Sequence, residues 1–396
     1  MKDLDKNKFF HYQFDGALVY KIAFVYFFVI SFLQSSTYND YFSPNVFHYL
    51  SLIALGLILF KIFFLDKQSI PIFIFNLLCI GLLVLTWRTS QSFALLPLGF
   101  FIIGARNVNF REIIKLYFII GLILLIFIMF SADVGLIKNL TYHREQSNVV
   151  RQSFGSVYPT DFASHVLFLV LAYIYLQFDK LTWRSYVVFI AIAFMLITFC
   201  DARLSSIAMI MSVPVVIIGK RAKEDKIISK FIASLYWIFP VITAYISIIG
   251  TIFFNKDNQV FSKINNLLSG RLMLSHSAFE KYGFSLFGEK VIEHGWGGTQ
   301  GLKMFRNNPA KYFFIDSSYI RVTIFYGIII MLLILITMTI ISLRSVHNEL
   351  FALASVMVIV SISAVVEQRL IDISFNPFLF ALFASTCKLK IKERKS

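Results

Sequence analysis

The sequence is poor in charged residues, cysteine and nucleotide-binding motifs, and each shortage argues against a class of protein. Charged residues make up 15% of the chain, against 58% apolar residues, whereas a soluble domain carries about 25% charged residues. The three cysteines show neither pairing nor metal-ligand spacing, which argues against a disulfide framework or a cysteine-based metal site. Neither a P-loop nor a dinucleotide-binding glycine pattern is present, so a nucleotide-dependent enzyme is not favoured.

Long apolar runs are what the sequence has instead. The mean hydropathy is +0.74, and the runs recur from end to end, most of them long enough to cross a bilayer. We therefore predict an all-α, polytopic membrane protein with about twelve transmembrane helices in a single integral membrane domain, residues 1–396. The predicted spans are residues 17–34, 47–65, 69–86, 92–105, 113–132, 162–178, 185–200, 205–219, 231–254, 320–343, 349–366 and 371–387.

The basic residues have a sidedness that nucleic-acid binding does not explain. The net charge is +15, but much of the lysine and arginine lies in short loops at alternate ends of the spans, as the positive-inside rule describes. We predict a multi-pass protein of the cell (inner) membrane whose termini are both cytoplasmic. Membrane lipid is then the expected surroundings, and nucleic acid is not an expected partner. On this topology, two long loops, residues 133–161 and 255–319, are extracytoplasmic.

The loop at 255–319 is the longest polar, glycine-containing segment, and loops on a rigid scaffold often carry functional sites. Apolar residues recur at helical spacing on both sides of Arg271, namely Ile264, Leu267, Leu268, Leu274 and Ala278. We therefore expect the loop to be partly helical, with one surface helix that directs Arg271 into the protein. The alternative is that a new helix begins after Ser269-Gly270 and leaves Arg271 on the surface.

Several other arginines occupy the predicted outer ends of spans, where the positive-inside rule disfavours them. They are Arg88, Arg151, Arg203, Arg321 and Arg369. Each arginine taken alone is explained by contact with lipid phosphate or by a local pair, such as Asp201 with Arg203. As a group they favour a bound pyrophosphate, because arginine matches phosphate oxygens with two parallel hydrogen bonds and stays charged.

Asp316 ends the long loop directly before a predicted span. Its carboxylate could accept a proton from a substrate hydroxyl, or it could cap the helix, as could Ser317 or Ser318. The turn Gly295–Gly298 around Trp296 is open to two interpretations, a sugar-stacking turn or a tight loop. The histidines on this side show no metal-ligand spacing.

Five short motifs together resemble a known family. The motifs are Arg151–Asp161, Asp201-Ala202-Arg203-Leu204-Ser205, Ser269-Gly270-Arg271-Leu272, Asp316-Ser317-Ser318-Tyr319-Ile320 and Tyr326-Gly327. In this order, over roughly residues 140 to 385, the chain resembles the Wzy-type polysaccharide polymerases and their relatives, the O-antigen ligases. The ligases usually have a histidine at the position of Asp316, so this departure favours the polymerase branch.

The resemblance implies a fold like that of the GT-C membrane glycosyltransferases. It also implies transfer of glycan from an undecaprenyl-pyrophosphate carrier at the outer leaflet, with no cofactor, metal or nucleotide sugar. The implied partners are the lipid-linked oligosaccharide, a flippase and a chain-length regulator. With the arguments above, it gives catalytic roles to Asp316, Arg271 and Arg203. Substrate contacts are expected from Arg151, Arg369, Arg88, Arg321, Asp161, Glu367 and Tyr319.

Two alternatives stay open from the sequence. A ligase would join the glycan to another acceptor with the same leaving group. A lipid-linked oligosaccharide flippase also has about twelve helices, but it needs a cavity open to both sides and has no use for a folded outer loop.

Overall fold

The computed structural model describes residues 15–144 and 147–386, and it confirms a helical, polytopic membrane protein. In this part of the chain, nine helices are long and apolar enough to cross a membrane. They are α1 (Gly16–Gln34), α2 (Pro44–Phe60, extended by the π-helical turn Lys61–Leu65), α3 (Ile70–Ser90), α5 (Phe110–Asp133), α6 (Pro159–Gln177), α7 (Trp183–Cys200), α8 (Arg203–Lys223), α9 with α10 (Ile227–Ser234 and Phe239–Ile252) and α14 (Ser318–His347). Two shorter apolar helices are α4 (Leu95–Gly104) and α15 (Phe351–Val366).

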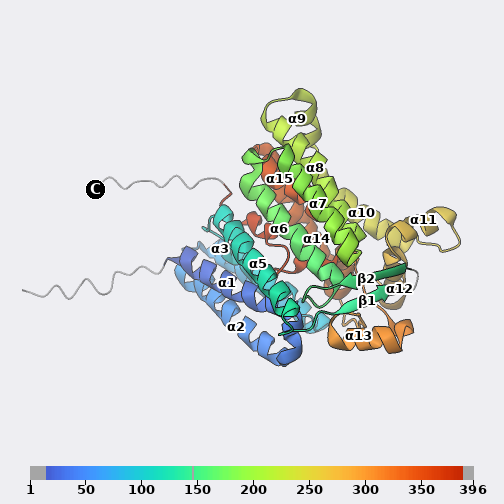
Figure 1. The fold of residues 1–396 in the computed structure, drawn as a ribbon. Coiled ribbons are helices and arrows are strands. Elements are labelled where there is room, and N and C mark those ends of the chain that lie inside the picture. Colours follow the sequence, from blue (N-terminus) through green and yellow to red (C-terminus); the bar gives the residue numbers. More distant parts are fainter. Residues whose placement is uncertain (1–14, 145–146, 387–396) are drawn as a thin grey trace, which may run out of the picture.

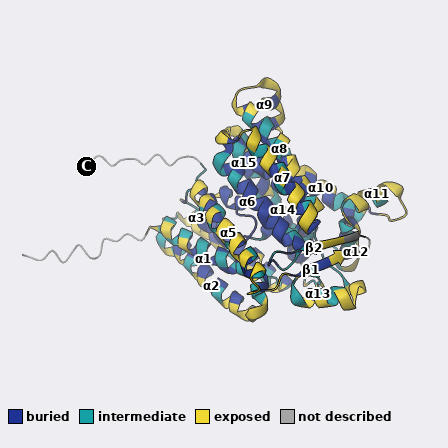
Figure 2. Ribbon diagram, viewed as in Figure 1, coloured by how far each residue is buried: buried dark blue, intermediate teal, exposed yellow. Residues whose placement is uncertain are grey.

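The helices α6, α14 and α15 lie at the centre of the molecule, and the other spans surround them (Figures 1 and 2). Surrounding helices such as α3 keep many exposed apolar side chains, as lipid-facing helices do. Small residues allow close approach in the centre, where Gly219 of α8 packs against Ser355 of α15. This is the usual packing device of helices in a membrane, where apolar surface alone does not drive association.

Short loops rich in basic residues meet at one end of the helices, which we call the basic end. Lys220 donates to the carbonyl oxygen of Leu181 at 2.5 Å, and Lys61 donates to that of Arg106 at 3.0 Å. The other end, where the two long loops meet, is called the cavity end. This separation matches the predicted alternation of the loops, although which end faces the cytoplasm stays a prediction. The terminal lysine clusters at 2–8 and 388–395 lie outside the described residues.

The predicted twelfth span does not form an α-helix in its described part, residues 371–386. Two short 3-10 helices lie in this region, Gln368–Ile371 and Phe378–Leu382. Pro377 breaks the pattern because it lacks a backbone donor. The segment nevertheless runs from the cavity end to the basic end, where the backbone of Ser385 donates to the carbonyl oxygen of Val108 at 2.8 Å. Irregular backbone at membrane depth is tolerated when protein surrounds it, and this segment is mostly buried.

The central helix α14 is interrupted at Gly327, which has φ 91° and ψ 167°. A loop around Gly288 inserts into the break and completes its backbone hydrogen bonds. Ile328 donates to the carbonyl oxygen of Ser285 at 2.9 Å, and Glu289 donates to that of Ile324 at 3.3 Å. The break lies roughly 13 Å along the helix from its first residue, so the long loop reaches into the layer of spans.

The long loops carry the remaining elements. Residues 133–161 contain an antiparallel hairpin, β1 (Thr141–Arg144) with β2 (Ser147–Gln152), which we did not predict. Residues 255–319 contain α11 (Gln259–Leu267), α12 (Arg271–Tyr282) and α13 (Gly298–Asn307). The expected single helix around Arg271 is wrong, because Ser269 and Gly270 both have positive φ, at 56° and 85°, and separate α11 from α12.

Candidate functional site

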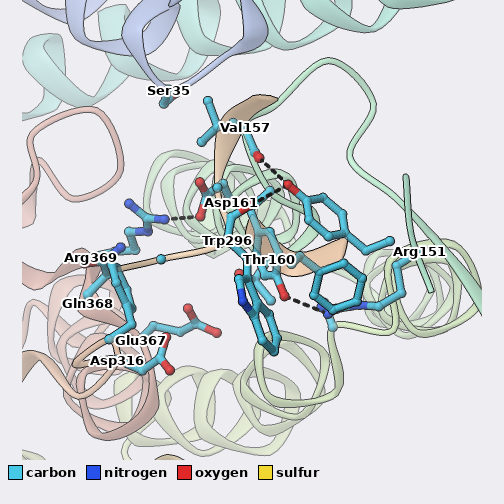
Figure 3. A pocket seen from close by; sticks show the side chains of 18 of the residues that line it. Ser35, Arg151, Val157, Thr160, Asp161, Trp296, Asp316, Glu367, Gln368 and Arg369 are labelled. Carbon is cyan, nitrogen blue, oxygen red and sulfur yellow. Dashed lines mark hydrogen bonds and ion pairs between the residues drawn. The ribbon is translucent and has the colours of Figure 1, made fainter. Parts of the chain in front are cut away.

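The cavity end holds a cavity of about 1070 Å³ (Figure 3). Its walls come from segments far apart in the sequence: the end of α1, the hairpin, the start of α6, the turn between α7 and α8, the start of α12, residues 295–316 and residues 367–372. Because these segments follow different spans, only the folded bundle brings their side chains together.

Seven of the ten predicted site residues line this cavity. They are Arg151, Asp161, Arg203, Arg271, Asp316, Glu367 and Arg369. The other three, Arg88, Arg321 and Tyr319, do not line it, which differs from the prediction. The cavity also contains Asp201 and Asp372. Its arginines therefore face a comparable number of carboxylates, and a bound anion would have to compete with them.

Arg151 is the cavity arginine that forms no ion pair with a carboxylate among the described residues. It lies on β2 opposite Tyr142, and its side chain is buried. Its Nε donates to the carbonyl oxygen of Cys200 at 2.9 Å, and a terminal nitrogen donates to the hydroxyl of Tyr158 at 3.0 Å. A guanidinium has five N–H donors, so donors are left for a ligand.

Arg203 begins α8, directly after a turn in which Asp201 has a left-handed backbone, φ 46°. The Nε of Arg203 lies 2.9 Å from the Asp201 carboxylate. The arginine side chain is 59% exposed, whereas the aspartate side chain is 6% exposed. The local pair predicted from the sequence is therefore present, yet the guanidinium stays accessible at the cavity.

Arg271 occupies the first turn of α12, but it points into the cavity instead of lying on the surface. Its Nε lies 3.4 Å from an oxygen of Asp316, and a terminal nitrogen lies 3.5 Å from an oxygen of Glu367. These are long contacts for charge-assisted hydrogen bonds, and the buried Nε has no hydrogen-bond partner among the described residues. Arg271 is therefore held loosely between two carboxylates.

Burial and charge act in opposite directions on this group. Burial raises the pKa of Glu367, although Arg271 opposes the shift. Burial disfavours the charged form of Arg271, but the carboxylates of Asp316 and Glu367 outweigh it and raise the pKa of the guanidinium. The hydroxyl of Ser205 also donates to Glu367, at 3.2 Å. The result is a charged guanidinium beside a carboxyl that resists ionisation.

Arg369 is held more firmly than Arg271. It donates to Asp161 and lies 3.8 Å from an oxygen of Asp372. Its guanidinium also stacks over the ring of Phe375, 4.3 Å from the ring centre. Asp161 is therefore the nearer partner of Arg369, and Asp372 is a long contact.

Asp316 is not the residue that caps α14. The cap position belongs to Ser317, whose side chain makes no capping hydrogen bond, and the hydroxyl of Ser318 donates to the carbonyl oxygen of Glu367 instead. The capping interpretation is therefore wrong for all three residues. The carboxylate of Asp316 faces the cavity beside Glu367 (Figure 3).

Of the three residues outside the cavity, two have other partners and one is exposed. Arg321 forms two 2.7 Å hydrogen bonds with Glu293. Tyr319 shares a hydrogen bond with Thr243 at 2.9 Å inside the bundle. Arg88 is exposed in the last turn of α3. We leave these three out of the proposed site.

A group of aromatic residues on the cavity wall was not predicted as a group. It consists of Tyr142, Tyr158, Trp296, Phe305 and Tyr312. The sequence held one signal for part of it, because Tyr312, Phe314 and Asp316 alternate, and alternate side chains of an extended segment share a face. Among the described residues, no group of three or more histidine, cysteine, aspartate or glutamate side chains could hold a metal ion.

Comparisons with known protein families, with curated proteins and with solved structures found no match for this chain.

Proposed function

We propose that this protein is a membrane glycosyltransferase that joins undecaprenyl-pyrophosphate-linked oligosaccharide repeat units into a surface polysaccharide at the outer leaflet. The observation that carries the proposal is a cavity at one end of the spans in which Arg151 and Arg203 lie with the Arg271–Asp316–Glu367 group. Lipid tails would lie among the apolar spans while their polar heads enter the cavity.

The proposed reaction breaks the bond between an anomeric carbon and a pyrophosphate oxygen. A hydroxyl oxygen of the acceptor sugar forms the new bond to that carbon, and its proton passes to Asp316. The pyrophosphate leaves with its electron pair and gains negative charge. Hydrogen-bond donors that already point at the developing charge stabilise the transition state most strongly where water is scarce.

The arginines contribute unequally to this proposal. Arg151 has no carboxylate partner among the described residues, and Arg203 is exposed, so these two are best placed to bind the pyrophosphate. Arg271 can turn toward it, because its contacts with Asp316 and Glu367 are long. Arg369 is engaged by Asp161 and stacked on Phe375, so it positions Asp161.

The test uses purified protein in detergent with lipid-linked repeat units as sole substrate. Wild type should make a ladder of multimers, and Asp316→Asn should slow its formation by about 10²- to 10⁴-fold, the usual contribution of general-base catalysis. Asp257→Asn is the matched control, since Asp257 is exposed on the same loop outside the cavity, and it should leave the rate unchanged.

Each other outcome contradicts part of the proposal. Absence of a ladder from wild type given its native substrate would refute the polymerase. Transfer of the glycan to an acceptor without a lipid pyrophosphate would identify a ligase. Movement of the intact lipid-linked unit across vesicles, with no new glycosidic bond, would identify a flippase. A normal ladder from Asp316→Asn would remove Asp316 from the mechanism.

A further inference from the structure

The backbone of Trp296, within the long loop, is held by two contacts. The hydroxyl of Tyr142 on β1 donates to its carbonyl oxygen at 2.7 Å. On the other side Gly301 of α13 packs so closely that a Cβ there would lie 2.3 Å from the carbonyl carbon of Trp296. The hairpin and the tight turn into α13 therefore hold this residue in place.

The indole ring of Trp296 is the centre of an aromatic wall, which we define as Tyr142, Tyr158, Trp296, Phe305 and Tyr312. Its ring centre lies 4.1 Å from that of Tyr312 and 4.8 Å from that of Phe305. All five residues line the cavity. Tyr142 is only 1% exposed, whereas the other four are half-buried.

The wall faces a polar cavity, where exposed aromatic surface has a cost unless a ligand covers it. Figure 3 shows the Trp296 side chain projecting into the cavity between Arg151 and the Asp316–Glu367 pair. The face of an aromatic ring carries negative potential, and it therefore attracts the C–H hydrogens on the apolar face of a sugar ring. The hydroxyls at the sugar's edge would remain free for the polar cavity walls.

The wall adjoins the groups that are proposed to react, since Tyr158 accepts a hydrogen bond from Arg151 at 3.0 Å. Tyr312 and Asp316 lie on the same side of the segment before α14, with Phe314 between them, and all three line the cavity. Four residues of extended chain span roughly 13 Å. The two side chains nevertheless converge on the cavity, where burial and then the nearby charge of Asp316 raise the pKa of Tyr312. A ring stacked on the wall therefore lies next to the reacting groups.

We propose that the aromatic wall is a sugar subsite, in which Trp296, with Tyr312 packed against it, stacks one pyranose ring of the oligosaccharide adjacent to the reacting ring. The inference rests on the proposed function for the identity of the glycan, but the binding itself does not require catalysis. Binding of a ring that does not itself react can be used to lower the barrier at the reacting centre. The subsite would select the repeat unit by a sugar that takes no part in the chemistry.

The test measures binding without the lipid or the pyrophosphate. The probe is the oligosaccharide repeat unit, released from the host polysaccharide by mild hydrolysis and labelled at its reducing end, added to the full-length protein in detergent. Trp296→Ala should weaken binding by about 10- to 100-fold, equivalent to roughly 1.4–2.8 kcal/mol, and lower kcat/KM for ladder formation in the same direction. Trp296→Phe keeps an aromatic face and should retain most of the binding.

Trp183→Ala is the matched control, because Trp183 is an exposed tryptophan at the opposite, basic end. It should bind the oligosaccharide like wild type. Thermal unfolding identifies any variant that has lost its fold, and Tyr312→Ala replaces Trp296→Ala in that case.

The two proposals fail in different ways. Unchanged binding and kcat/KM in folded Trp296→Ala and Tyr312→Ala proteins would overturn the subsite and leave the polymerase standing. Oligosaccharide binding that depends on Trp296, with no ladder from wild type, would overturn the polymerase and leave the subsite standing. Equal losses in Trp296→Ala and Trp183→Ala would also overturn the subsite.

Discussion

Arg151 and Cys200 are joined by a 2.9 Å hydrogen bond from the guanidinium Nε to the backbone carbonyl oxygen. The bond fastens the hairpin to the turn between α7 and α8, three residues before Arg203. The turn between α7 and α8 therefore holds Arg151 and carries Arg203, the two arginines that we assign to the pyrophosphate. Neither is enclosed by carboxylates, unlike Arg271, which contacts both Asp316 and Glu367.

Replacement of either arginine by lysine tests that assignment. Arg151→Lys and Arg203→Lys keep the charge but lose the planar fork, so polymer in cells should fall at least about tenfold at normal protein level, a loss of roughly 1.4 kcal/mol in transition-state stabilisation. Polymer is measured by gel and protein by immunoblot. Arg88→Lys, exposed and outside the cavity, is the control and should have no effect. Wild-type polymer from both cavity variants would refute the assignment.

The break in helix α14 predicts that substitutions of its glycines lower the stability of the fold. A Cβ on Gly327 would lie 2.2 Å from the carbonyl oxygen of Leu286, and one on Gly288 would lie 2.1 Å from that of Phe325. Because both also have positive φ, either change to alanine should reduce the free energy of unfolding by at least about 2 kcal/mol.

The matched control for these variants is Gly81→Ala within α3. A Cβ on Gly81 would meet no atom within 4 Å, and alanine favours a helix by up to about 1 kcal/mol over glycine. Thermal unfolding in detergent measures all three variants. If Gly327→Ala and Gly288→Ala unfold at the wild-type temperature, the loop does not occupy the break as described.

Glu367 predicts how stability changes with pH. Burial raises its pKa in the folded protein above the ordinary value of 4.5, so its stabilising contribution is full below pH 4.5 and is lost as the pH rises through the raised value. The charged groups that act on it are Arg271, Asp316, Arg369 and Asp161. The unfolding temperature of wild type minus that of Glu367→Gln should therefore fall from about pH 4 to pH 8. A difference that rises over this range would show that attraction to the arginines outweighs burial.

The predicted topology can be tested with single cysteines in a background free of native cysteine. Position 300 lies on α13 at the cavity end, and position 224 follows α8 at the basic end; both residues are exposed. An impermeant thiol reagent should label Gln300→Cys in intact cells and Glu224→Cys only after the membrane is opened. The reverse result would place the cavity in the cytoplasm and remove the outer-leaflet reaction with it.

The sequence by itself determined the class of protein and most of its spans. Apolar runs longer than a bilayer crossing leave few alternatives to a helix, because backbone groups in lipid must bond within their own segment. It also selected most of the arginines and acids at the cavity, since charge at the ends of spans stands out against apolar runs. The segment 371–387 was the exception, because hydropathy measures burial and does not distinguish a helix from the irregular buried backbone around Pro377.

The tertiary structure decided which of those residues meet. Arg321 and Arg271 were both predicted at the site from sequence, yet Arg321 pairs with Glu293 outside the cavity, whereas Arg271 reaches Asp316 and Glu367 inside it. Such partners lie on separate segments of the chain, and their distances depend on how the helices pack. The same holds for the aromatic wall, whose rings come from the hairpin, the start of α6 and the long loop, and no local pattern connects those segments.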